Sequence, residues 1–196
     1  MEKRSRILIV IASLMFVFTF LFPLWNIGLQ APQYPEGLGL KIWSHKITGL
    51  NEHDLKIINE LNHYIGMQRI TPESIKELKI MPYILGFLIL FGLIAAFYKN
   101  TTLVKVWIAL IIVLGIIGLY DFYMWEYNYG HNLSPDAPIK IPGMVYQPPL
   151  LGTKQLLNIT ATSLPGLGSI AIFVSLAIAV FVVWKEKKLK RGSNVK

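Results

Sequence analysis

Four long apolar stretches dominate the pattern of hydrophobic and polar positions along the chain. They cover about residues 7–25, 80–98, 103–125 and 167–184. Each falls within the roughly 17–25 residues that an α-helix needs to cross the hydrocarbon core of a bilayer. The pattern therefore predicts four transmembrane helices in a single integral membrane domain, residues 1–196.

The first stretch follows a basic start that contains Lys3, Arg4 and Arg6. A signal peptide has the same charge pattern, but no small-x-small cleavage site follows this apolar core. We therefore expect an uncleaved helix that ends near Pro23, with Trp25 at the depth of the lipid headgroups.

The segments between the apolar stretches, residues 26–79 and 126–166, are predicted to be two extracytoplasmic loops. In the first, residues 38–43 alternate apolar with small or polar positions and indicate a short strand. Asn51 is the expected N-cap of a helix that runs from Glu52 to about Ile65, and Gly66 is placed where such a helix ends.

The second loop is rich in proline and glycine, and residues 139–141 and 145–146 are predicted as short strands around a turn at Pro142 and Gly143. Together the loops are expected to form a small mixed cap of one short helix and short strands. The predicted fold class is an all-α membrane protein that carries this cap.

The third stretch ends in an aromatic cluster, residues 120–129. Tyrosine and tryptophan gather at headgroup depth, so the cluster is interpreted first as an interfacial belt. Asp121 lies within it, near the end of a span where a carboxylate is costly. A hydrogen-bonded structural role is the first expectation for Asp121, and a proton or metal role is the second. Glu126 is the other acid near this end of the span.

Composition agrees with a membrane protein. The chain is 54% hydrophobic and 15% charged, with a mean hydropathy of +0.50, whereas soluble domains carry about 25% charged residues. The net charge of +8 does not indicate nucleic acid, because the basic residues cluster beside the apolar stretches. The positive-inside rule is the simpler explanation.

The distribution of charge predicts the orientation. The two chain ends and the turn between the second and third stretches hold 11 Lys and Arg against two acids, and the rest of the chain holds eight against nine. Basic residues stay on the cytoplasmic side. We therefore expect both termini in the cytoplasm of a bacterium, the helices in its inner membrane, and both loops in the periplasm.

The chain has no cysteine, which excludes disulfides, thiolate zinc sites, iron–sulfur clusters and a cysteine nucleophile. It also has no GxSxG, HExxH or phosphate-loop motif, so we do not expect an enzyme. Any metal must be held by histidine, methionine, carboxylate or backbone.

All the histidines lie in the two loops, together with Met67 and Met144. Imidazole and thioether together suit Cu(I) better than zinc or magnesium. Ordinary loop histidines and methionines that pack at a membrane edge are the alternative explanation. The preferred metal ligands are one histidine–methionine pair from each loop: His63, Met67, His131 and Met144.

His63 and Met67 are four residues apart, so on a helix they would share one face. If the helix ends at Gly66, they straddle its terminus instead, and the site needs its other half from the second loop. His53 would lie about 15 Å from His63 on the same helix, too far for a shared mononuclear site.

Several motifs carry a resemblance to a known family. They are Phe22-Pro23-Leu24-Trp25, residues 31–38, Asn62-His63-Tyr64-Ile65-Gly66-Met67, Tyr129-Gly130-His131-Asn132-Leu133 and residues 142–149. The chain resembles a family of small bacterial four-span membrane proteins that occurs with nitrous-oxide-reductase maturation genes in Bacteroidetes-type organisms.

The resemblance implies a membrane-anchored accessory protein that binds copper as a chaperone for the maturation of a periplasmic copper enzyme. Its expected partners are the lipid bilayer and a periplasmic copper protein or copper chaperone, with no nucleic acid. The alternative is a non-metal scaffold that docks a partner through Val145, Tyr146, Leu150 and Leu151. A quinone- or haem-linked subunit is the least favoured reading, because no histidine lies within a span.

Overall fold

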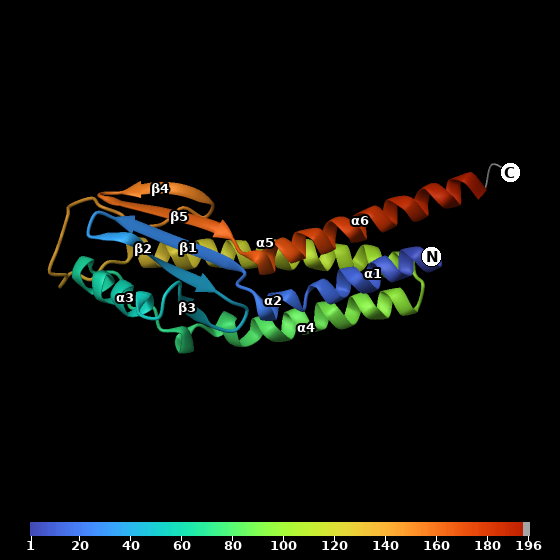
Figure 1. Ribbon diagram of the computed structural model, residues 1–196, viewed down its shortest axis with the longest axis horizontal. Coiled ribbons are helices and arrows are strands. Elements are labelled where there is room, and N and C mark those ends of the chain that lie inside the picture. Colours follow the sequence, from blue (N-terminus) through green and yellow to red (C-terminus); the bar gives the residue numbers. More distant parts are fainter. Residues whose placement is uncertain (194–196) are drawn as a thin grey trace.

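The computed structural model describes residues 1–193 and shows an elongated molecule with two parts. A bundle of long helices has the start of its first helix and the end of its last helix toward one tip, and a β-sheet with a short helix forms the opposite end (Figure 1). The long helices are α1 (Lys3–Met15) with the short α2 (Phe18–Leu21), then α4 (Lys76–Phe97), α5 (Thr101–His131) and α6 (Leu167–Ser193).

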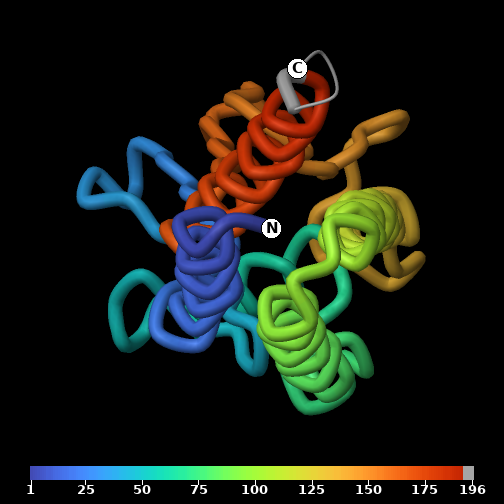
Figure 2. The backbone as a smooth tube through the Cα atoms, turned by 90° about the vertical axis from the view of Figure 1, so that its right-hand side faces the viewer, coloured from blue at the N-terminus to red at the C-terminus, as the bar shows by residue number. Residues whose placement is uncertain are grey.

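Within residues 1–193, four helical stretches are long and apolar enough to cross a membrane: Lys3–Leu21, Lys76–Phe97, Thr101–His131 and Leu167–Arg191. The four membrane-crossing helices predicted from the apolar pattern are thus confirmed by helix length and composition. Helix α1 packs on α4 and α6, and α5 also packs on α4 and α6. The end-on view in Figure 2 shows α1 beside both of its neighbours.

The prediction of an all-α fold with a small cap is wrong, because the described residues contain a five-stranded antiparallel sheet. Its strands are β1 (Trp25–Ala31), β2 (Tyr34–Ile42), β3 (Ile47–Gly49), β4 (Gly152–Leu156) and β5 (Ile159–Pro165), in the order β3-β2-β1-β5-β4. The central strand follows the first membrane helix almost directly. Trp25 therefore begins β1 and is buried in the sheet core.

The sheet joins segments that are far apart in the sequence. Ile27 of β1 lies opposite Leu40 of β2 on one side and Ser163 of β5 on the other. The Trp25 indole donates a hydrogen bond of 2.7 Å to the Ser163 hydroxyl across this pairing. The segment before the helix of the first loop and the segment before α6 thus form one sheet.

The strands predicted at residues 139–141 and 145–146 are also wrong, since residues 132–151 contain no strand. Prolines at positions 135, 138, 142, 148 and 149 remove backbone donors from this segment, which makes it unsuitable for a sheet interior. The strand predicted at residues 38–43 is present as the second half of β2, which ends at Ile42 and pairs with β1 and β3.

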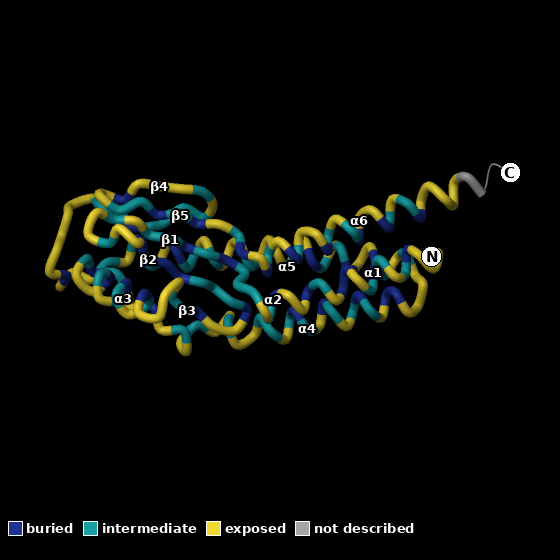
Figure 3. The backbone as a smooth tube through the Cα atoms, in the orientation of Figure 1, coloured by how far each residue is buried: buried dark blue, intermediate teal, exposed yellow. Residues whose placement is uncertain are grey.

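The core of the sheet domain is partly built by the last turns of α5. Phe122, Trp125 and Tyr129 pack against the buried cluster that contains Trp25 and Ile27. These aromatics therefore serve as core residues, and the interfacial belt over residues 120–129 stays a prediction. Figure 3 shows buried positions in the middle of β2 and along the inward sides of the helices, with exposed positions along the outward sides of the helices.

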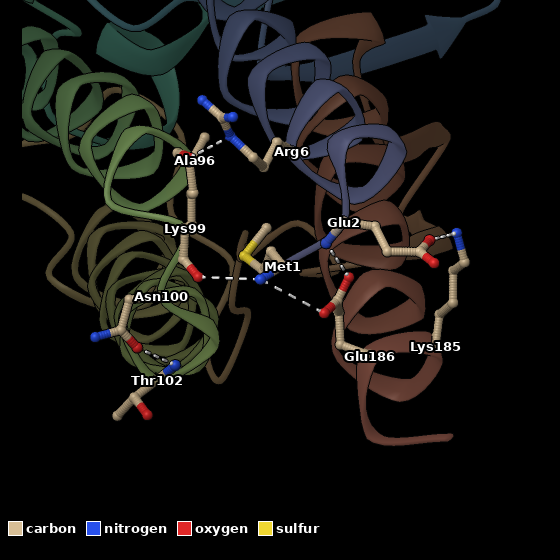
Figure 4. A network of polar contacts seen from close by, with 9 residues as sticks. All are labelled: Met1, Glu2, Arg6, Ala96, Lys99, Asn100, Thr102, Lys185 and Glu186. Carbon is tan, nitrogen blue, oxygen red and sulfur yellow. Dashed lines mark hydrogen bonds and ion pairs between the residues drawn. The ribbon is translucent and has the colours of Figure 1, made fainter. Parts of the chain in front are cut away.

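The opposite tip of the bundle is closed by a polar network around the first residues of the chain (Figure 4). The Met1 amino group donates to the Lys99 carbonyl at 3.3 Å and forms an ion pair with Glu186 at 3.8 Å. The Glu2 amide donates to Glu186 at 2.9 Å, and Lys185 pairs with the Glu2 carboxylate at 2.8 Å. The start of α1 is thereby fixed to α6 and to the α4–α5 turn.

Candidate functional site

Helix α3 (Asp54–Ile65) ends in the way its sequence predicts. Gly66 adopts the left-handed conformation, with φ +81°. The Gly66 amide donates to the His63 carbonyl at 3.4 Å, and the Met67 amide donates to the Asn62 carbonyl at 2.9 Å. This pair of bonds is a Schellman motif. His63 and Met67 therefore lie on either side of the helix terminus.

The start of α3 differs from the prediction. The helix begins at Asp54 with His53 as its N-cap residue, and Asn51 makes no side-chain cap. The Asp54 carboxylate instead accepts the Asn51 amide at 3.1 Å and the Gly39 amide at 2.9 Å. Asp54 thus fixes α3 to β2, which positions the other end of the helix.

The C-terminal end of α3 meets the proline-rich segment that follows α5. The Ser134 amide donates to the Gly66 carbonyl at 2.7 Å, and the Ile139 amide donates to the Tyr64 carbonyl at 2.9 Å. A Cβ at Gly66 would lie 2.8 Å from the Cβ of Ala137. Glycine is therefore required here for two reasons, the positive φ and the close approach of Ala137. We call this contact of residues 64–66 with residues 134–139 the loop junction.

A second contact ties the proline-rich segment to the end of α5. The Tyr146 amide donates to the Gly130 carbonyl at 3.1 Å. A Cβ at Gly130 would overlap the Gln147 backbone nitrogen. The residues around position 146 are thereby held against the turn of α5 that carries His131.

The His131 ring has a defined orientation. Its Nδ1 lies 3.0 Å from the Tyr127 carbonyl oxygen, and the ring stacks on the Tyr127 ring with centroids 3.8 Å apart. A carbonyl only accepts, so Nδ1 carries the hydrogen. In a neutral ring Nε2 then holds the lone pair, which is the arrangement found in metal-ligating histidines.

The four predicted ligands all flank the contacts just described. His63 is exposed, and Met67, His131 and Met144 are half-buried. His63 and Met67 flank Gly66, which bonds to Ser134. His131 follows Gly130, whose carbonyl accepts from Tyr146, two residues after Met144. The two histidine–methionine pairs thus come from segments that the backbone hydrogen bonds join.

The other two histidines are not part of this junction. His53 is the N-cap residue at the opposite end of α3, where its side chain makes no capping hydrogen bond. His45 interacts with the Ser44 hydroxyl at 3.3 Å beside β2. Within residues 1–193 there is no group of three or more His, Cys, Asp or Glu that could hold a metal ion. Any metal site at the junction therefore depends on its methionines.

Two polar groups near the junction are buried, and this burial was not predicted from the sequence. Glu126 is fully buried on α5, and neither carboxylate oxygen has a hydrogen-bond partner among the described residues. The hydroxyl of buried Tyr146 also lacks one. Glu126 lies one helical turn before Gly130, to which Tyr146 is bonded. The signal in the sequence for the burial of Glu126 was its position one turn after Phe122, on the side of α5 that faces the core.

The residues predicted for partner docking do not form one exposed surface. Tyr146 is 7% exposed, whereas Leu151 is 63% exposed. Val145 and Leu150 are half-buried. Tyr146 is therefore a packing residue of the proline-rich segment.

The chain matches no protein-family model and no curated protein. The expected resemblance to the nitrous-oxide-reductase maturation family stays a prediction.

Proposed function

We propose that the protein is a membrane-anchored accessory protein that binds copper at the loop junction and hands it to a periplasmic copper protein, of the nitrous-oxide-reductase type. The single observation that carries this proposal is the pair of backbone hydrogen bonds, Ser134 to Gly66 and Ile139 to Tyr64. They join the two loops that each supply one histidine and one methionine. Without this contact the four residues would belong to independent segments.

The donor chemistry supports copper over other metals. Thioether and imidazole ligands favour Cu(I), and the sequence has no cysteine to compete. His63 and His131 are the imidazole ligands and Met67 and Met144 the thioether ligands. Copper is the cargo here, so a site made by four side chains from two segments serves both uptake and release.

We further propose a bacterial inner-membrane location with both termini in the cytoplasm. The bundle tip that holds the start of α1 and the end of α6 also holds the Lys99–Lys105 turn, so the basic residues of these segments gather at one end of the molecule (Figure 1). The positive-inside rule assigns that end to the cytoplasm. The sheet domain and the loop junction are then periplasmic.

The test is copper stoichiometry and affinity on the purified full-length protein. We expect wild-type protein to bind one Cu(I) and the His63→Ala/His131→Ala pair to lose this binding. The matched control is the His45→Ala/His53→Ala pair, which removes two exposed histidines away from the junction and should leave binding unchanged. Equal loss in both pairs, or no loss in the first, would contradict the assignment of ligands.

Failure of copper binding in the wild-type protein would favour the scaffold alternative. In that case the junction would be a structural brace.

A further inference from the structure

An apolar cavity of about 450 Å³ lies among helices α4, α5 and α6 where the bundle meets the sheet. Its walls include Ile84 of α4, Leu114 of α5 and Ile172 of α6, and Trp25 and Trp43 border it from the sheet domain. A pocket of this volume accommodates a ligand of several hundred daltons or a hydrocarbon chain.

Two glycines leave room in the α5 wall of the cavity. Gly115 and Gly118 of α5 line it, and a Cβ built at either glycine meets nothing within 4 Å. The packing in the other half of the bundle is different. There, a Cβ at Gly92 would lie 2.8 Å from the buried ring of Trp107. The helices are thus tightly packed near the chain ends and open toward the sheet.

The cavity extends along the helices over the depth of one leaflet. Its lining on α5 runs from Ile111 to the carboxylate level at Asp121, and at 1.5 Å per residue this is about 15 Å. The hydrocarbon of one leaflet is roughly 15 Å deep, half of the bilayer core. A hydrocarbon chain inserted from the headgroup level therefore matches the length of the space.

Two carboxylates line the end of the cavity nearest the sheet. Glu77 is in the first turn of α4 and Asp121 lies on α5 about three turns before the helix ends. Both line the cavity, and two like charges at one end of an apolar space repel each other. Both side chains are exposed, and among the described residues neither has an ion pair with a basic side chain. A bound headgroup that carries a positive charge and donates hydrogen bonds would relieve this repulsion, whereas an anionic headgroup would add to it.

We propose that this cavity is a binding site for an aminolipid. One hydrocarbon chain occupies the space between α4, α5 and α6, and the primary ammonium of the headgroup lies between Glu77 and Asp121. An ammonium has three N–H donors, which suits two carboxylates. A trimethylated choline has no N–H donor and fits less well. The site is independent of the loop junction.

The test compares lipids that remain bound to the full-length protein, measured by native mass spectrometry after equal exposure to phosphatidylethanolamine, phosphatidylcholine and phosphatidylglycerol. We expect phosphatidylethanolamine to be retained about tenfold over phosphatidylcholine, the factor that a charge-assisted hydrogen bond supplies. The Glu77→Gln/Asp121→Asn pair should reduce this ratio to about one. The control pair, Glu52→Gln/Glu73→Gln, removes two exposed acids outside the cavity and should leave the ratio unchanged.

A second variant tests the hydrocarbon part. Gly118→Leu places a side chain in the cavity and should reduce retention of every lipid at least several-fold. Gly86→Leu is the control, because a Cβ at Gly86 also meets nothing within 4 Å but Gly86 does not line the cavity. Equal retention of the three lipids by the wild type, or unchanged retention in Gly118→Leu, would overturn the proposal. Copper binding should be unaffected in all of these variants, so failure here is distinct from failure of the copper role.

Discussion

The substitution Gly66→Ala tests whether the loop junction depends on the close approach of its two segments. Alanine must adopt φ +81°, which costs about 1–2 kcal/mol for a residue with a side chain. Its Cβ would also lie 2.8 Å from the Cβ of Ala137 and 3.1 Å from the Ser134 amide nitrogen. Moving these apart weakens the hydrogen bond from Ser134 to Gly66, worth about 1 kcal/mol. We expect the junction to lose about 2–3 kcal/mol in total.

Amide hydrogen exchange at Ser134 and Ile139 measures this loss directly, because both amides donate across the junction. Local opening that becomes easier by about 2–3 kcal/mol accelerates exchange roughly 30- to 150-fold. The matched control is Gly37→Ala. Gly37 has φ +76°, and a Cβ there meets only an ordinary contact at 3.5 Å. It carries the same backbone cost without the overlap at the junction.

The control should leave exchange at both reporter amides unchanged. If Gly66→Ala and Gly37→Ala affect Ser134 and Ile139 equally, the junction does not depend on close approach and the reasoning above is refuted. Copper affinity measured on the same two variants then links the contact to the proposed function, since Gly66→Ala removes no ligand. A weakened affinity is expected in Gly66→Ala alone.

Two further substitutions test the packing of each half of the molecule. Gly92→Ala should lower the thermal midpoint of unfolding in detergent, because overpacking against Trp107 costs about 1–3 kcal/mol. Gly86→Ala is the control: a Cβ there meets nothing within 4 Å, so the midpoint should stay unchanged or rise. The opposite ranking of the two midpoints would contradict the packing described here. Trp25→Phe removes the buried indole N–H that donates to Ser163 and should cost about 1–2 kcal/mol of stability. The measurement is amide hydrogen exchange in β1 and β5, which should become faster. Unchanged exchange would show that this bond contributes nothing to the pairing of the two strands.

The agreement between sequence and structure is good where a segment carries its own signal. The end of α3 at Gly66 follows from a glycine after an apolar stripe, and the structure has the left-handed residue there. His63 and Met67 therefore straddle a helix terminus, as predicted. The proposed site is different, because the sequence named its four residues without showing that two loops meet. Only the hydrogen bonds at Gly66 and Tyr64 establish that contact.

The sheet was underestimated because its central strand is adjacent to a membrane helix. Residues 25–31 read Trp-Asn-Ile-Gly-Leu-Gln-Ala, which alternates apolar with polar or small positions as a strand does. The apolar run before it extended the predicted helix to Trp25, and no strand was predicted over residues 26–31. The β4–β5 hairpin was likewise hidden at the end of a loop dominated by proline and glycine.

The sequence by itself determines the four long apolar helices, because length and hydropathy fix a membrane-crossing helix without reference to any partner. Tertiary structure alone decides that β1 pairs with β5 across more than a hundred residues, that Trp125 belongs to the sheet core, and that the bundle opens into a cavity beside Gly118. Each of these depends on which distant segment supplies the other half of a contact. A strand leaves its hydrogen bonds to be completed by its neighbours, whereas a helix completes its own.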